Sequence, residues 1–166
     1  MNKALANLLI ISGLSILLVF CVHFYQINNP NRLKIENSAN LKIENSKEIY
    51  PLSLEIKDLD ISLPVIPTVY DGKNWNTTSD GVSYIGNNIF YGHNWKSILG
   101  NLTHSKIGQK ISVYFSDKTI KIYEIVEIKI VEPNNTNILS VANNKTLIIY
   151  TCTGFFDSKR FVVIAK

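Results

Sequence analysis

Residues 146–166, TLIIYTCTGFFDSKRFVVIAK, contain two apolar runs on either side of a short polar and aromatic segment. Runs of this length that are rich in β-branched and aromatic side chains are typical of β-strands. Because side chains alternate across a strand, Cys152 shares one face with Tyr150, and Arg160 shares one face of the next strand with Val162. Seven residues separate Cys152 from Arg160, so a hairpin with a loop would set these two side chains next to each other.

Upstream, from residue 51 onward, similar short runs are broken by Gly, Asn, Asp and Pro, which favour turns. Charge alternates with Ile or Tyr in residues 119–131, which predicts a half-buried antiparallel strand, whereas residues 147–150 are apolar on both faces and predict a covered strand. About eight strands in about 115 residues indicate a closed barrel or a sandwich. The expected strands are 54–56, 62–70, 81–85, 88–92, 110–115, 119–131, 146–152 and 160–165. Residues 95–104 are expected to form a short helix or a loop over the site.

Residues 4–26, ALANLLIISGLSILLVFCVHFYQ, contain no Asp, Glu, Lys or Arg. At about 1.5 Å per residue, about 22 helical residues span a bilayer core of about 30 Å, so the segment predicts a transmembrane helix. A cleaved signal peptide is the alternative, but its apolar region is usually only about 7 to 15 residues and is followed by small residues at the cleavage site. We therefore expect residues 1–26 to be a cytoplasmic tip and an uncleaved anchor, with no lipid on Cys21.

Residues 27–50 are rich in Asn, Ser, Lys and Glu, and LKIENS occurs twice, at 33–38 and 41–46. Two copies are too few for a repeat fold, so a duplication within a flexible stalk is the plain interpretation. Such a stalk of about 25 residues has an end-to-end distance of roughly 25 to 30 Å. Residues 51–166 then form the third part of the chain.

The formal net charge is +4, and the 17 basic residues are scattered rather than clustered. This pattern does not favour a nucleic-acid partner. Lys and Arg are more numerous after the apolar segment than before it, so the positive-inside rule alone would place the following domain in the cytoplasm. An extracytoplasmic location of this domain therefore has to be argued from its function and not from charge.

The chain has two cysteines, and the predicted span separates Cys21 from Cys152, so they cannot form a disulfide. Cys152 is therefore a lone thiol, and His93 directly follows the apolar run 88–91 and a glycine. A thiolate can attack a carbonyl, a histidine can move the protons, and an arginine such as Arg160 can stabilise an oxyanion. Each residue alone has a structural explanation, but together they predict acyl transfer through a thioester. His104 lacks a preceding apolar strand and is a weaker candidate.

The segment 146–152 followed by Arg160 resembles the Thr-Leu-x-Thr-Cys and Arg signature of the sortase family, with additional residues between Leu147 and Thr151. Gly92 and His93 resemble the catalytic histidine segment of that family. The resemblance covers about residues 51–166. It implies an all-β fold, a closed eight-stranded antiparallel sortase-type β-barrel, and a cysteine transpeptidase.

By this resemblance, Cys152 is the nucleophile, His93 the general acid and base, and Arg160 the residue that stabilises substrate and oxyanion, with Thr151 in a supporting role. The partners implied are secreted or surface proteins that carry a C-terminal sorting motif, and an amine nucleophile of the cell wall or of a pilin. The implied location is the cell membrane, with one span at residues 4–26 and the catalytic domain outside the cytoplasm.

No cofactor is expected. Calcium dependence stays open but is not supported by the sequence, because the acidic residues Asp58, Asp60, Asp71 and Asp80 are dispersed and do not have the spacing of calcium ligands. The short segment between Cys152 and Arg160 and the lack of an Asp-Pro-aromatic lid motif in residues 27–50 make the chain more similar to class D or E sortases. Two alternatives remain at this point. A thiol protease or hydrolase would use the same residues, and an inactive surface barrel would only bind peptides.

Overall fold

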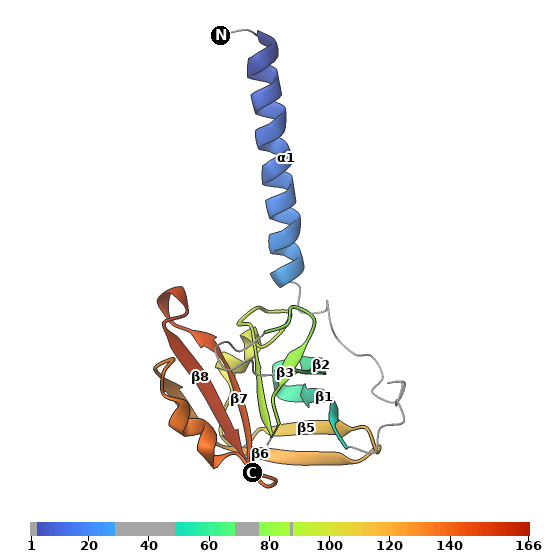
Figure 1. Ribbon diagram of the computed structural model, residues 1–166, viewed down its shortest axis with the longest axis vertical. Helices are drawn as coiled ribbons and strands as arrows, with labels where there is room; N and C mark the ends of the chain where they lie inside the picture. The colour runs from blue at the N-terminus through green and yellow to red at the C-terminus, as the bar shows by residue number, and fades with distance from the viewer. Residues whose placement is uncertain (1–2, 29–48, 69–76, 87) are drawn as a thin grey trace.

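The computed structural model describes residues 3–28, 49–68, 77–86 and 88–166. Within these ranges the chain forms one α-helix, α1 (Lys3–Asn28), and eight strands (Figure 1). The strands are β1 (Pro51–Ile56), β2 (Ile61–Pro67), β3 (Val82–Tyr84), β4 (Ile89–Gly92), β5 (Lys110–Phe115), β6 (Ile120–Val131), β7 (Leu147–Thr153) and β8 (Lys159–Ala165). Residues 69 and 70 of the expected second strand and the stalk repeat at 33–46 lie outside the described residues.

Helix α1 is apolar on all sides and does not pack against the strands. Its segment Lys3–Gln26 is apolar and is not buried against the rest of the protein. The helix is therefore long and apolar enough to cross a membrane, as the sequence predicted.

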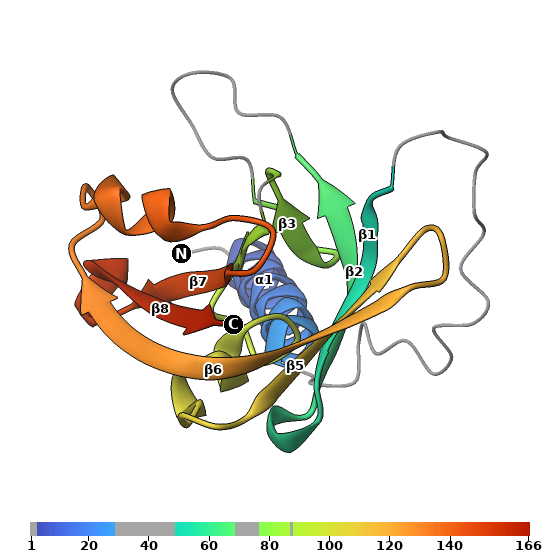
Figure 2. The ribbon, with the colours of Figure 1, turned by 90° about the horizontal axis from the view of Figure 1, so that it is seen from below.

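The eight strands close into a barrel in the order β1-β2-β3-β4-β7-β8-β6-β5 (Figure 2). This confirms the predicted closed, eight-stranded architecture, with one correction to its pairing. The pairs β2–β3 and β4–β7 are parallel, whereas the remaining pairs among the described strands are antiparallel. A parallel pair needs a long crossover connection, and the chain between β4 and β7 provides one through β5 and β6.

Strand β6 is half-buried and antiparallel to both of its neighbours, as its alternating sequence predicted. Tyr123 and Ile125 point into the barrel, while Ile120, Ile122 and Ile130 are exposed. The register shifts between Ile125 and Glu127, and a bulge of this kind changes which side chains face inward.

Two hydrophobic clusters lie on opposite faces of β7. The larger cluster fills the barrel and includes Leu147 and Ile149. The smaller cluster lies outside the barrel, where Ile148 packs with Val162 and Ile164 beneath the 3₁₀ segment η4 (Thr136–Val141). Strand β7 is therefore covered on both faces, as expected from its sequence, and the outer cluster holds the β6–β7 connection against the sheet.

The outer cluster should contribute directly to stability. Replacing the fully buried Ile148 with alanine removes apolar contacts and leaves a cavity, so Ile148→Ala should lower the free energy of unfolding by about 2–5 kcal/mol. Ile130→Ala, on the neighbouring β6 and 63% exposed, is the matched control and should change it by less than about 0.5 kcal/mol. Denaturant unfolding followed by circular dichroism measures both, and equal effects would show that the outer cluster is not a core.

Candidate active site

Cys152 and Arg160 lie directly opposite each other in the β7–β8 hairpin. Because opposed residues of an antiparallel pair project from the same face, their side chains share the outer face of the barrel with the pair Tyr150 and Val162. The hairpin thus brings together the two residues that the sequence singled out first.

His93 reaches the same place through the parallel pairing of β4 with β7. Gly92 is in register with Thr151, so the next residue along each strand, His93 and Cys152, lie at the same end of the pair. The Thr151 hydroxyl donates a buried hydrogen bond of 2.8 Å to the Gly92 carbonyl. This bond ties the residue before the histidine to the residue before the cysteine.

The imidazole ring of His93 stacks on the indole ring of Trp95, with ring centroids 4.2 Å apart and an interplanar angle of 6°. Trp95 in turn packs against the main core. The chain turns back sharply here, since the amide of Gly100 donates to the Trp95 carbonyl at 2.7 Å. A Cβ at position 100 would lie only 2.8 Å from that carbonyl oxygen, so the turn requires glycine. The expected short helix is the 3₁₀ segment η3 (Gly100–His104).

Burial sets the ionisation of both candidate catalytic groups. It lowers the pKa of His93 below its ordinary value, and the charge of Asp157 offsets part of this shift. Burial also raises the pKa of the Cys152 thiol; Arg160 opposes this rise, and Asp157 adds to it. Arg160 therefore favours the thiolate, but burial outweighs its effect on the pKa of Cys152. Neutral thiol and neutral imidazole predominate near pH 7.

Arg160 also fixes the turn between β7 and β8. Its Nη1 donates to the carbonyl oxygens of Asp157 at 2.8 Å and of Lys159 at 2.9 Å. The turn contains the short 3₁₀ segment η5 (Phe155–Asp157). The guanidinium group is thereby held at the level of Cys152 by backbone that belongs to its own hairpin.

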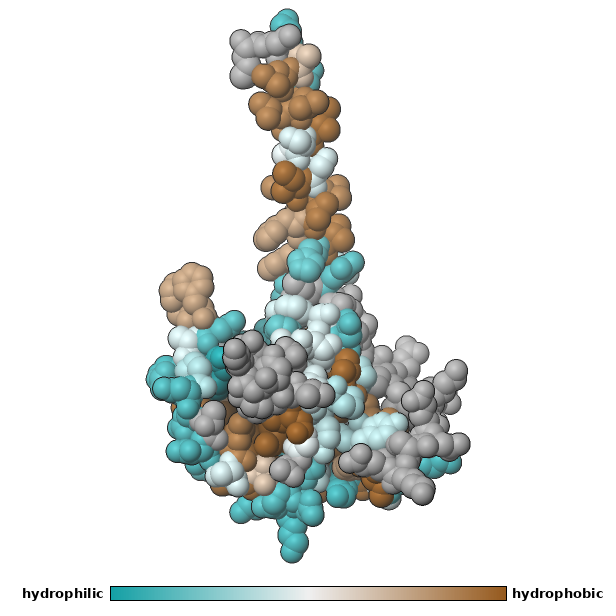
Figure 3. Space-filling model, in the orientation of Figure 1, coloured by the Kyte–Doolittle hydropathy of each residue, from teal (hydrophilic) through white to brown (hydrophobic). Residues whose placement is uncertain are grey.

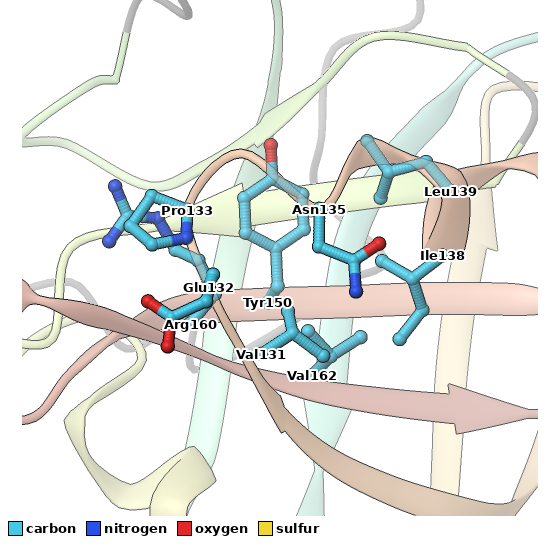
Figure 4. A pocket seen from close by; sticks show the side chains of 9 residues that line it. All are labelled: Val131, Glu132, Pro133, Asn135, Ile138, Leu139, Tyr150, Arg160 and Val162. Atoms are coloured by element: carbon cyan, nitrogen blue, oxygen red, sulfur yellow. The ribbon is translucent and has the colours of Figure 1, made fainter.

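Arg160 also lines a shallow pocket on the outer face, whereas Cys152 and His93 are not among its lining residues. Its walls come from the β6–β7 connection and from β7 and β8: Val131, Glu132, Pro133, Asn135, Ile138, Leu139, Tyr150, Arg160 and Val162. In Figure 4 the Tyr150 ring stands between the side that carries Pro133 and the side that carries Leu139. An ion pair between Lys159, the first residue of β8, and Glu132 joins the β7–β8 hairpin to the β6–β7 connection. The arrangement suits an extended peptide segment with apolar side chains.

The remaining sequence candidates lie elsewhere. His104 is exposed at the end of η3, and Cys21 is a free, exposed cysteine on α1. Among the described residues, no group of three or more His, Cys, Asp or Glu side chains is placed to hold a metal ion; Asp71 lies outside these residues.

Sequence reasoning missed Trp95 and Asp157, both of which act on His93. An aromatic residue two positions after a candidate histidine is a signal that could have found the first. Asp157 could have been noticed only as an acid within the short segment between Cys152 and Arg160.

Comparison with known proteins points to one family. The family model for the sortase domain matches residues 54–166. Sortase A from Corynebacterium diphtheriae, as a lid mutant, has 23% sequence identity and a TM-score of 0.57 over 68% of this chain and 67% of that chain. Streptococcus agalactiae sortase C1 in complex with MTSET has 16% sequence identity and a TM-score of 0.58, over 69% of this chain and 65% of that chain.

Sortase C-1 from Actinomyces oris is similar to the same degree, with 22% identity and a TM-score of 0.57 over 68% of this chain and 70% of that chain. The chain spans about two thirds of the length of these three structures. At these identities the structures show a shared fold. No curated protein sequence matches the chain.

The hydrogen bond from Thr151 to Gly92 can be tested by Thr151→Val. Valine preserves the shape of the side chain but leaves the buried Gly92 carbonyl without its donor, so the free energy of unfolding should fall by about 1–3 kcal/mol. Thr151→Ser keeps the hydroxyl, so its free energy of unfolding should fall by less. Denaturant unfolding of both variants measures the contribution of this hydrogen bond. If the serine variant is as unstable as the valine variant, the lost methyl group and not the hydrogen bond explains the serine result.

The lowered pKa of His93 predicts the direction of a pH effect on stability. Below about pH 6.5 the unfolded chain binds a proton at this histidine more readily than the folded protein does, so folding stability falls as the pH falls from there. His93→Gln should remove this part of the loss. Unfolding measured between about pH 7 and pH 5, together with an NMR titration of the imidazole, checks both statements. A His93 that titrates above the value of a histidine in a short peptide would contradict them.

Proposed function

The chain belongs to the sortase family, and we propose that it is a membrane-anchored cysteine transpeptidase with Cys152 as its nucleophile. One observation carries the proposal. The register of β7 places Cys152 opposite Arg160 in β8 and at the same end as His93, which follows the parallel strand β4. The residues proposed as nucleophile and cation therefore lie in adjacent strands, and the proposed acid–base group directly follows a third strand.

In the first half of the reaction, the thiol proton passes to the imidazole of His93, and the Cys152 thiolate attacks the carbonyl carbon of the scissile peptide bond. Arg160 remains charged and offers donors to the oxyanion that forms on the carbonyl oxygen. The intermediate collapses when the imidazolium gives its proton to the leaving amine. A thioester on Cys152 remains.

In the second half, an amine acceptor attacks the thioester. His93 takes a proton from the incoming amine, and the Cys152 sulfur leaves as the thiolate, which regains the proton. Because neutral thiol and neutral imidazole predominate near pH 7, only a minor fraction of the enzyme holds the ionised pair before the first attack.

The substrate we propose is the C-terminal sorting motif of a secreted or surface protein, bound as an extended segment in the pocket beside Arg160. The walls from Ile138, Leu139 and Val162 would receive apolar side chains. Burial raises the pKa of Tyr150, so its hydroxyl stays protonated and can donate a hydrogen bond to a peptide carbonyl. The acceptor is proposed to be an amine of the cell wall or of a pilin.

The proposed location follows from α1 and from this chemistry. The helix would cross the cell membrane once, and the barrel would lie outside the cytoplasm, where secreted proteins and wall amines are accessible. Neither a nucleic-acid partner nor a metal cofactor has a part in this mechanism.

The nucleophile can be identified with a peptide library and full-length protein. Cys152→Ala should abolish peptide cleavage because no other group in the site can form the thioester, and the wild-type protein should carry a substrate-derived acyl adduct on Cys152 in mass spectrometry. Cys21→Ala removes the other cysteine and should cleave like the wild type. Turnover by Cys152→Ala, or an adduct elsewhere, would contradict the proposal.

Adding triglycine in the same assay distinguishes transpeptidase from hydrolase. A transpeptidase should convert the product acid into the triglycine adduct as the amine concentration rises. An unchanged product spectrum would show that water resolves the thioester, and no turnover by any form of the protein would favour a peptide-binding barrel.

A further inference from the structure

Two adjacent phenylalanines at the tip of the β7–β8 turn are almost fully exposed. Phe155 is 83% exposed and Phe156 is 89% exposed. Their rings contact each other edge to face, with centroids 4.3 Å apart. In Figure 1 the turn projects from the barrel on the side from which α1 extends, and Figure 3 shows apolar atoms at the tip of that projection. The rings therefore form a small convex apolar tip.

The backbone that presents these rings is costly. Phe156 has a φ of 49° and Asp157 a φ of 56°, which is the left-handed region that bulky side chains rarely adopt. None of the residues of η5 is buried, so packing against the barrel does not compensate for the cost. The two hydrogen bonds from Arg160 to the carbonyls of Asp157 and Lys159 hold the turn in this form. Strain of this kind, maintained to expose apolar surface, indicates a binding function.

The chain itself brings a suitable apolar environment close to this tip. Residues 29–50 connect α1 to β1, and from their composition we expect an end-to-end distance of roughly 25 Å for a linker of that length. A domain of about 115 residues has a radius of gyration of about 13 Å. An anchored barrel would therefore stay within about one of its own diameters of the bilayer surface.

We propose that Phe155 and Phe156 insert into the lipid interface of the membrane in which α1 is anchored, an inference that rests on the proposed anchoring. Aromatic rings bury apolar area at the boundary between headgroups and acyl chains. The insertion is shallow, because Asp157 directly follows the two rings and its carboxylate cannot enter hydrocarbon without a large cost. The occupant of this apolar tip is thus lipid rather than a protein groove.

Insertion would also orient the active site. The turn joins Cys152 to Arg160, so a tip held in the headgroup layer keeps the thiol next to the membrane surface. A secreted substrate that is still held by the membrane would meet the site there. The two phenylalanines would then act on the orientation of the enzyme and not on the chemical step.

Tryptophan reporters in full-length protein test the insertion. Phe156→Trp, with Phe155→Trp as a second reporter, is reconstituted into vesicles of equal parts phosphatidylglycerol and phosphatidylcholine, with and without bromine near the glycerol end of the acyl chains. Ile107→Trp is the matched control. Ile107 is 69% exposed, and it lies near the other end of β8, since the next residue, Gly108, bonds to Ile125 opposite Ala165.

After subtraction of the wild-type signal, bromine should quench the tryptophan at 155 or 156 at least about twofold more than the one at 107, since quenching requires contact with lipid. Vesicle flotation of the same samples tests the anchor separately, and peptide cleavage tests the chemistry separately. Equal quenching at both ends of the barrel in floating protein would overturn the insertion. So would a signal at 156 that depends on protein concentration instead of bromine, because a second copy would then cover the tip.

Discussion

The parallel pairing of β4 with β7 is the constraint on which the site depends. These strands are separated by two others along the chain, yet their register puts Gly92 beside Thr151, so that His93 and Cys152 follow at the same end of the pair. Shifting the pairing by one residue would turn one of the two side chains to the other face of the sheet, because the side-chain period of a strand is two. The buried bond from the Thr151 hydroxyl to the Gly92 carbonyl opposes such a shift. The arrangement of the candidate site is thus a consequence of strand register.

Much of the fold follows from local sequence patterns. Each strand was predictable from β-branched and aromatic runs between turn residues, and the Cys152–Arg160 pair followed from alternation within one hairpin. The parallel pairings could not be predicted in this way, because nothing local in residues 88–92 specifies a partner strand about sixty residues away. A resemblance that implies an antiparallel barrel misses the two exceptions, and one of them places His93.

The candidate site was less predictable than the strands that carry it. Residue types identified Cys152, His93 and Arg160, but not the balance between their charges and their burial. A sequence shows that a cation is near a thiol, whereas desolvation depends on side chains from several elements. For the same reason the ring stacking of Trp95 on His93 and the effect of the Asp157 charge on the pKa of His93 come from the structure.

The outer cluster of Ile148, Val162 and Ile164 has a consequence for how such a protein can diverge. It attaches the β6–β7 connection to the sheet through side-chain packing, while Cys152, Arg160 and His93 belong to, or directly follow, the strands themselves. Substitutions in η4 can therefore reshape the pocket wall without moving Cys152 or Arg160, provided that an apolar face remains beneath it. One wall of the pocket can therefore change in the β6–β7 connection while the wall from β7 and β8, which carries Tyr150 and Arg160, stays constant.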